Sequence, residues 1–240
     1  MKEVHYFDSH LDKGVEWYLE QIPDVMPDEL AFEKTAKYFI TPNASVALKA
    51  LNPNVKILLA VRDPTQRTYS CYFQRLSRMM DGPGSFESKV FMSNGEVNCI
   101  SQPCWREVKI FNLQIDEDYY CVNVSLYHNH MEQWLQTFPR DQIHLVDGER
   151  LIKKPWYEID KIIEFLGLEF ENAQDKYVYS EDRGFFCLDD GLGHGCLPKN
   201  KGRTSEHGDM DRKTRRRLEK FFDPHNQVFF NQVGREFKWG

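Results

Sequence analysis

The feature that most constrains the fold is a short apolar run, Lys56-Ile57-Leu58-Leu59-Ala60-Val61. An uninterrupted apolar run of this length that ends in a polar turn predicts a central parallel strand, buried on both faces. Arg62-Asp63-Pro64 follows, and then a helical stretch, which Asp63 can cap and in which Pro64 suits the first position. Because ligands of open α/β sheets bind at the carboxyl ends of strands, Arg62 lies at a favoured place for binding.

The alternation of strands and helices continues along the chain. Apolar spacing predicts helices at about 127–138 and 156–166, a strand at 143–146, and helices around residues 218–230. This order predicts an α/β fold with a central parallel sheet flanked by helices. Residues 93–121 have weak periodicity, and we interpret them as a long excursion. No domain boundary is evident, so we expect one domain over residues 1–240.

Composition excludes several classes of protein. With 240 residues, of which 41 % are hydrophobic, the chain has the profile of a globular protein with an ample core. Its net charge of −6 argues against a generic nucleic-acid binder. The sequence contains no run of about 18 apolar residues, so it predicts no membrane-spanning helix. The basic segment from Lys199 to Lys220 is either a binding place for an anionic partner or a solvated helix face.

Cysteines and glycosylation sequons bear on the cellular compartment. Six cysteines in a chain of this length do not form a disulfide scaffold, but Cys187 and Cys196 bracket a loop that a disulfide could close at its base. Sequons at Asn43 and Asn123 fit a secretory compartment. The N-terminus lacks the apolar stretch of a signal peptide, so we expect the natural N-terminus to lie further upstream.

Four clusters of residues could carry chemistry, and the first is Glu3-Val4-His5-Tyr6-Phe7-Asp8. Alternation places Glu3 and His5 on the same side of an extended segment, and a carboxylate beside an imidazole suits general-base catalysis. An ordinary strand end with polar residues is the alternative. A metal site made of His5, Asp8 and His10 is not favoured, because nothing else has ligand spacing.

The other three clusters are cationic. Lys34 and Lys37 lie in EKTAKYF, and lysine ammonium groups suit phosphate or sulfate. Arg62 and Ser70 could hold a phosphate monoester, unless Asp63 and Arg67 merely form a helix pair. Residues 199–205 contain two lysines, an arginine, a glycine and two hydroxyls, which together suit an anion-binding loop.

These clusters, in this order, resemble one family closely, the heparan sulfate glucosamine 3-O-sulfotransferases. The resemblance is carried by KEVHYFD, EKTAKYF, VRDPTQRTYSCY, SLYHNHMEQWL, HLVDGERLIKKP, GFFCLDDGLGHGCL and KNKGR. It extends from Lys2 to the C-terminal segment 233–237, and residues 99–117, which interrupt it, look like an insertion. Motifs this numerous and in the same order are highly specific.

The resemblance implies a fold and an activity. The implied fold is the P-loop-NTPase-like sulfotransferase fold. The implied reaction moves a sulfuryl group from 3′-phosphoadenylyl sulfate (PAPS) to the 3-hydroxyl of glucosamine units in heparan sulfate, with no metal. The implied protein is a monomer of the Golgi lumen or secretory pathway. A catalytically silent heparan-sulfate-binding protein is the alternative, whereas a nucleotide kinase is disfavoured because GxxxxGK[ST] is absent.

The resemblance also implies roles for individual residues. Glu3 matches the catalytic base, and Lys34 is expected near the acceptor and the transferring group, although Ala36 stands where the family has proline. Substrate contacts are implied for His5, Asp8, Lys37, Gln74, Tyr119 and His207. The PAPS-binding residues are expected to be Arg62 and Ser70 at the 3′-phosphate, with Lys201, Gly202, Arg203, Thr204 and Ser205 in the loop that closes over it. Cys187 and Cys196 match the family disulfide.

One element of the family is expected to be missing. The family begins with a strand and a loop rich in lysine and glycine that cradles the 5′-phosphosulfate, and both precede the residue that matches Glu3. This chain starts at Met1, two residues before Glu3. We therefore expect the first strand, the loop and a catalytic lysine to be absent from this chain, which leaves its own activity open.

Overall fold

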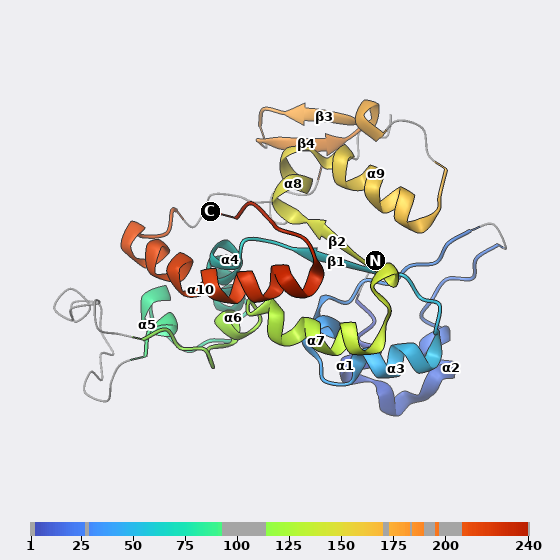
Figure 1. Ribbon diagram of the computed structural model, residues 1–240, viewed down its shortest axis with the longest axis horizontal. Coiled ribbons are helices and arrows are strands. Elements are labelled where there is room, and N and C mark those ends of the chain that lie inside the picture. The colour runs from blue at the N-terminus through green and yellow to red at the C-terminus, as the bar shows by residue number, and fades with distance from the viewer. Residues whose placement is uncertain are drawn as a thin grey trace. The chain divides into compact units, whose positions relative to one another are not determined.

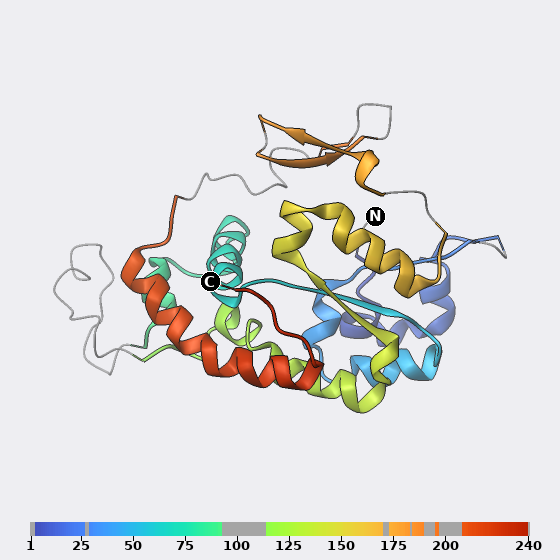
Figure 2. The same cartoon turned by 45° about the horizontal axis from the view of Figure 1, so that its top comes forward.

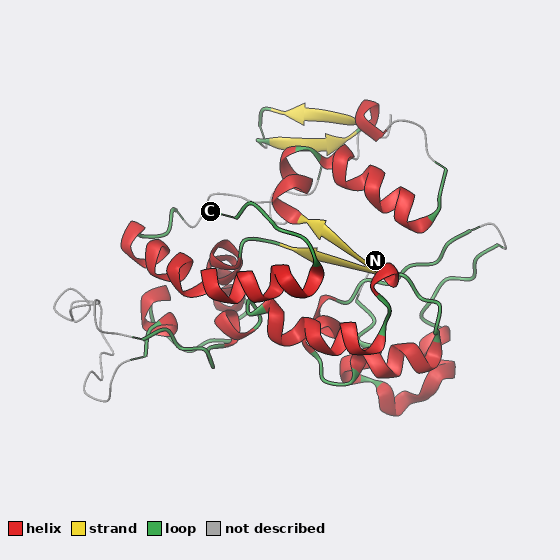
Figure 3. Ribbon diagram, viewed as in Figure 1, coloured by secondary structure: helices red, strands yellow, loops and turns green. Residues whose placement is uncertain are grey.

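A computed structural model describes residues 3–26, 29–92, 114–169, 173–182, 184–189, 195–196 and 208–239. Most of the ordered elements are helices, and the strands form two small sheets (Figure 3). The chain divides into two compact units. The first unit contains Met1–Leu59 and Asn129–His144, and the second contains Ala60–His128 and Leu145–Gly240.

The first unit is helical and has an aromatic core. Its elements are α1 (Tyr6–Ser9), α2 (Gly14–Leu19), α3 (Ala44–Leu51), most of α7 (Tyr127–Thr137) and the 3₁₀ turns η1 (Leu11–Lys13), η2 (Ala36–Ile40) and η5 (Arg140–Gln142). Tyr6 stacks on Tyr18 with ring centroids 4.6 Å apart, and Phe7 meets Tyr38 edge to face at 5.2 Å. These contacts join α1 to α2 and η2, and so they fix the segment that carries Glu3 and His5.

The predicted strands at 56–61 and 143–146 are confirmed as β1 (Ile57–Val61) and β2 (Ile143–Asp147). They are neighbours in one two-stranded sheet, and their arrows point the same way in Figure 1. The expectation that β1 is a central strand buried on both faces is wrong, because Leu58 is 44 % exposed whereas Val61 is fully buried. In the described chain β1 pairs only with β2, and alternate side chains of β1 lie on an uncovered face.

The second unit places helices and a hairpin around the ends of these strands. Its elements are α4 (Pro64–Ser77), α5 (Phe86–Val90), α6 (Tyr120–Asn123), α8 (Gly148–Lys153), α9 (Pro155–Leu166), η6 (Ala173–Lys176), β3 (Tyr177–Ser180), β4 (Phe185–Leu188) and α10 (Arg212–Val233). Asp63 caps α4 by accepting a hydrogen bond from Thr65 N at 2.8 Å, as its position predicts. Gly167, with φ 73°, ends α9. In Figure 2, α4 and α10 lie close together, and Tyr72 of α4 shares a buried core with Leu218 and Phe222 of α10.

The antiparallel hairpin β3–β4 is a feature that the sequence pattern did not predict. Val178 pairs with Cys187, and Tyr179 pairs with Phe186. Phe186 also meets Trp156 of α9 edge to face at 5.0 Å, which ties the hairpin to the helix layer. Cys187 forms a disulfide with Cys196, so the bond that the resemblance implies lies on β4.

A second disulfide joins Cys71 of α4 to Cys121 of α6. Thr68 Oγ1 of α4 donates to the Cys121 carbonyl of α6 at 3.3 Å, and Ser125 Oγ, which follows α6, donates to the same carbonyl at 2.8 Å. The bond thus closes a loop of about fifty residues around a buried, hydrogen-bonded contact. Because Ser70 precedes Cys71, this disulfide also helps to fix the helix turn that carries Ser70.

A short bridge brackets the region interpreted as an excursion. Phe91 and Ile115 form an antiparallel bridge, Met92 N donates to Gln114 O at 2.9 Å, and Asp116 N donates to Val90 O at 2.8 Å. Of the expected insertion at 99–117, residues 99–113 lie outside the described residues, as do Cys99 and Cys104.

The Cys71–Cys121 bond gives a direct prediction about stability. Replacing both residues, Cys71→Ser and Cys121→Ser, should lower the free energy of unfolding by about 4 kcal/mol, because the unfolded chain regains the entropy of a loop of that length. Urea denaturation of the oxidised protein and of the variant measures the difference. A reducing agent should destabilise the unchanged protein more than the variant, which lacks this bond. Equal urea midpoints before reduction would contradict the prediction.

Candidate functional site

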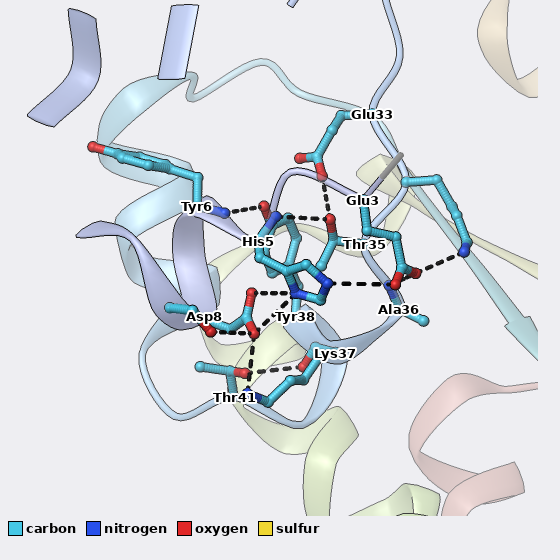
Figure 4. Close-up of polar contacts among 12 residues, drawn as sticks. Glu3, His5, Tyr6, Asp8, Glu33, Thr35, Ala36, Lys37, Tyr38 and Thr41 are labelled. Carbon is cyan, nitrogen blue, oxygen red and sulfur yellow. Dashed lines mark hydrogen bonds and ion pairs between the residues drawn. The ribbon is translucent and has the colours of Figure 1, made fainter. Parts of the chain in front are cut away.

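Five side chains of EVHYFD and EKTAKYF form one chain of contacts in the first unit (Figure 4). Lys34 Nζ lies 2.6 Å from Glu3 Oε1, and Glu3 Oε2 lies 3.5 Å from Nε2 of His5. His5 Nδ1 lies 3.1 Å from Asp8 Oδ1, and Lys37 Nζ lies 3.1 Å from Asp8 Oδ2. We name this arrangement the ionic chain; its members are Lys34, Glu3, His5, Asp8 and Lys37.

The backbone beneath the ionic chain is not the extended segment that alternation predicts. His5 adopts a left-handed conformation with φ 59°, and Tyr6–Ser9 then form a helical turn. The backbone N–H of His5 donates to Thr35 Oγ1 at 3.3 Å, and that of Tyr6 donates to the Tyr38 hydroxyl at 2.8 Å. Side chains of the EKTAKYF segment therefore satisfy donors that a neighbouring strand would otherwise satisfy, and the turn brings Asp8 beneath the His5 ring.

Burial differs strongly along the ionic chain. The Asp8 side chain is 1 % exposed, the Glu3 side chain 33 % and the Lys34 side chain 68 %. Burial alone would raise the pKa of Asp8, but hydrogen bonds from Lys37, Ser9 and His5 outweigh it and hold that pKa below its usual range. The pKa of Glu3 is lowered chiefly by the hydrogen bond from Lys34. Both carboxyl groups are therefore ionised at neutral pH.

The two ends of the ionic chain suit different tasks. At the buried end, Asp8 anchors the Nδ1 side of the His5 ring and one ammonium group. At the exposed end, the Glu3 carboxylate is open to solvent beside the Lys34 ammonium, and it also accepts a hydrogen bond from the backbone N–H of Ala36 at 3.2 Å. A carboxylate held in this way can take a proton from an approaching hydroxyl, while the ammonium group faces the charge that develops nearby.

The metal interpretation of His5, Asp8 and His10 gains no support from the geometry. His10 turns toward Trp17, with ring centroids 5.3 Å apart in an edge-to-face contact. Among residues that the structure describes, no group of three or more His, Cys, Asp or Glu side chains is arranged to hold a metal ion.

Arg62, in the second unit, lies directly after β1 and is held by the turn that follows β2. Its Nε donates to Glu149 Oε1 at 3.2 Å. Asp147 accepts hydrogen bonds from the backbone N–H groups of Glu149 and Arg150 at 3.0 and 3.1 Å, which orients this turn. A Cβ on Gly148 would lie 2.6 Å from Arg62 Cγ and 2.9 Å from the Val61 carbonyl oxygen, so only glycine allows this approach.

Glu149 is a residue that sequence reasoning missed. Its position just after the carboxyl end of β2, next to the strand that Arg62 follows, was the signal that could have identified it. Thr35 and Tyr38 were missed as well, because their role depends on contacts with a segment 30 residues away in sequence.

Other predicted residues are placed as follows. Ser70 and Gln74 are exposed on α4. Tyr119 donates from its hydroxyl to Asp81 Oδ2 at 2.9 Å, and Arg75 pairs with Asp81 as well. Burial, together with the hydrogen bond to Asp81, raises the pKa of Tyr119. Lys201, Gly202, Arg203, Thr204, Ser205 and His207 lie outside the described residues.

The sequons differ in exposure. Asn43 is exposed at the start of α3, although Ser45 of its sequon is buried and hydrogen-bonds to Thr137 Oγ1 at 2.9 Å. Asn123 is half-buried in α6, and Ser125 is 1 % exposed.

The lowered pKa of Asp8 predicts a pH dependence of stability. Its contribution to the free energy of unfolding should be complete above the unfolded pKa of about 3.9 and should disappear as the pH falls through the lower folded value. The difference in stability between the unchanged protein and Asp8→Asn, measured by urea unfolding, should therefore be larger at pH 6 than at pH 2.5. Asp12→Asn, which removes an exposed carboxylate in the same unit, is the control variant. A difference independent of pH would contradict the prediction.

Comparison with known proteins identifies the family of the chain. The sulfotransferase domain family matches residues 1–232. The chain is 35 % identical over 240 residues to human heparan sulfate glucosamine 3-O-sulfotransferases 3B1 and 3A1, covering 99 % of this chain and 57 and 54 % of those proteins. It is 32 % identical over 241 residues to mouse heparan sulfate glucosamine 3-O-sulfotransferase 5, again over 99 % of this chain and 65 % of that protein. The chain thus spans about half to two thirds of the length of these curated relatives.

A solved structure shows the same fold. The sulfotransferase from Alicyclobacillus acidocaldarius superposes with a TM-score of 0.63 over 99 % of this chain and 85 % of its own, at 18 % identity. The expected α/β sulfotransferase fold, a parallel sheet flanked by helices, is therefore confirmed. The chain belongs to the sulfotransferase domain family.

Proposed function

We propose that the protein transfers a sulfuryl group from PAPS to the 3-hydroxyl of glucosamine units in heparan sulfate. The observation that carries the proposal is the exposed end of the ionic chain, where the Glu3 carboxylate and the Lys34 ammonium lie 2.6 Å apart. The likeness to heparan sulfate glucosamine 3-O-sulfotransferases over 99 % of the chain supports this choice of donor and acceptor. No metal enters the proposed reaction.

Sulfuryl transfer, like phosphoryl transfer, requires an aligned nucleophile, a base and positive charge near the transferring group. Glu3 takes the proton of the 3-hydroxyl as the hydroxyl oxygen forms its bond to sulfur. The bond between sulfur and the phosphate oxygen breaks, and adenosine 3′,5′-bisphosphate leaves with that electron pair. Lys34 faces the charge on the transferring group.

The contact between Lys34 and Glu3 also links basicity to donor binding. The hydrogen bond from Lys34 is the largest influence that lowers the pKa of Glu3. When the ammonium group turns toward a bound sulfuryl group, Glu3 loses that hydrogen bond and its pKa rises. The carboxylate therefore becomes a stronger base when the donor is in place.

The remaining members of the ionic chain position the base and contact the acceptor. The His5 ring lies between the Glu3 and Asp8 carboxylates, which limits its rotation. Lys37 is half exposed and can meet a sulfate of the polysaccharide from its place beside Asp8. Gln74 and Tyr119 are proposed as further acceptor contacts, together with His207.

Arg62 and Ser70 are proposed to bind the 3′-phosphate of the nucleotide. Arg62 donates a hydrogen bond to Glu149 through Nε, so its two terminal nitrogens can form a bidentate contact with phosphate oxygens. Residues 201–205 are proposed to add further cationic and backbone contacts at the same end of PAPS.

The proposed cellular setting is the secretory pathway, and it rests on the family resemblance, which favours the Golgi lumen. The disulfides Cys71–Cys121 and Cys187–Cys196 support an oxidising compartment. Among the described helices, none is both long and apolar enough to cross a membrane. We propose that the protein acts there as a monomer, with a glycan at the exposed Asn43 and a second sequon at Asn123.

Replacing Glu3 tests the role of the base. Glu3→Gln keeps the size of the side chain but cannot take the hydroxyl proton, so the transfer rate should fall by about 10²–10⁴-fold while heparan sulfate binding changes little. The assay follows labelled sulfate from PAPS to heparan sulfate with the natural protein that contains this chain, and the position of the new sulfate is mapped. Glu20→Gln, an exposed change in the same unit, is the control. Full activity of Glu3→Gln would refute the role of Glu3. Binding without any transfer by the unchanged protein would instead favour a catalytically silent binding protein.

Replacing Arg62 tests the nucleotide site. Arg62→Ala should weaken binding of adenosine 3′,5′-bisphosphate by about 2–4 kcal/mol, because a charge-assisted, partly buried contact is lost. Titration calorimetry measures the affinity, and Arg78→Ala, which removes an exposed arginine at the end of α4, is the control. Unchanged affinity in a folded Arg62→Ala protein would remove Arg62 from the nucleotide site.

A further inference from the structure

The second unit contains an open pocket of about 450 Å³ between α8, α9 and the C-terminal segment. Four cationic side chains line it, Arg150, Lys153, Lys154 and Lys238, together with the ring of Tyr157. We name it the basic pocket. None of these five residues belongs to the ionic chain, whereas Glu149, which also lines the pocket, pairs with Arg62 of the proposed nucleotide site.

Acidic side chains offset only part of the positive charge of the basic pocket. Arg150 lies 3.9 Å from Asp147 and 3.7 Å from Glu158, and Glu149, which also lines the pocket, pairs with Arg62. The three lysines are exposed, and no carboxylate of the described chain lies within ion-pair distance of their ammonium groups. In a protein with a net charge of −6, this convergence of like charges favours an anionic ligand.

The chain holds the pocket in place with buried contacts. Arg150 Nη1 lies 3.7 Å from Glu158 Oε1, and Arg235 Nη2 lies 3.5 Å from the same oxygen. Phe237 is 5 % exposed and stacks with Trp239, whose ring centroid is 4.9 Å away. The segment that carries Lys238 is therefore anchored on both sides of Lys238, and the lysine approaches α8 from a separate part of the chain.

Tyr157 gives the basic pocket a flat apolar surface among the cations. The ring is 45 % exposed, with the Arg150 guanidinium 4.9 Å and the Lys161 ammonium 4.5 Å from its centroid. Two cation–π contacts thus restrain the ring. The exposed part of the ring can contact the C–H groups of a pyranose while neighbouring cations meet the sulfate and carboxylate groups of the sugar. A pocket of this size with dispersed cations suits several saccharide charges better than a single small anion.

We propose that the basic pocket binds sulfated polysaccharide through sugar units other than the reacting glucosamine. This inference rests on the proposed function, because it takes the acceptor to be a long polyanion. Once one part of such a chain is bound at the reacting site, a second contact becomes intramolecular and raises the overall affinity. The basic pocket would therefore favour long acceptors over short ones.

The test compares two acceptors, long-chain heparan sulfate and an oligosaccharide too short to engage a second site. For Lys153→Ala/Lys238→Ala, KM for the long chain should rise about 3–10-fold with kcat unchanged, since two exposed charge contacts are lost. KM for the short acceptor and the affinity for adenosine 3′,5′-bisphosphate should not change. The control Lys56→Ala/Lys176→Ala removes the same charge from exposed positions outside the pocket and should leave all values within about twofold.

Tyr157 supplies a second variant pair. Tyr157→Ala should raise KM for the long chain. Tyr157→Phe retains the ring, so its KM for the long chain should equal that of the unchanged protein. An unchanged KM for the long chain in the lysine variant would overturn the inference. An equal rise in KM for both acceptors, or a weaker affinity for the nucleotide, would overturn the inference as well, because the pocket would then belong to the reacting site. Absence of transfer by the unchanged natural protein would refute the proposed function itself, a result that differs from each of these.

Discussion

The buried carboxylate of Glu158 is the interaction on which much of the second unit depends. Its side chain is fully buried, yet it accepts a hydrogen bond from Asp147 N at 2.9 Å and has Arg235 and Arg150 within 3.5 and 3.7 Å. Burying a carboxylate destabilises the fold by several kcal/mol unless the carboxylate is well paired. The end of β2, α8 and the C-terminal segment must therefore meet at Glu158. The turn that holds Arg62 is built on the same junction.

In the first unit, the ionic chain holds an exposed carboxylate in place. Asp8 is buried and fully engaged, whereas Glu3 keeps one side open to solvent. A carboxylate that acts as a base, the role proposed for Glu3, must be accessible, but it must also be held in one orientation before substrate arrives. Linking Glu3 through the His5 ring to a buried partner meets both requirements, because the fixed end restrains the accessible end without covering it.

Sequence reasoning succeeded where the signals are local and failed where they are not. The start of α4 follows from the cap of Asp63 and the ring of Pro64, and the end of α9 follows from Gly167, all of which act within a turn of the chain. The left-handed His5 could not be predicted, since it depends on bonds from a distant segment. The pairing of Cys71 with Cys121 and the role of Glu149 likewise depend on which helices and strands become neighbours. The predicted residues of the ionic chain lie in contact because the motifs EVHYFD and EKTAKYF, each recognisable alone, pack against one another.

The bridge between Phe91 and Ile115 has a consequence for how this protein can diverge. The bridge joins the chain on either side of residues 93–113, so the core of the second unit meets the same two ends whatever number of residues lies between them. A change in the number of residues between these two ends is therefore compatible with the same core, as long as Phe91 and Ile115 keep their bridge.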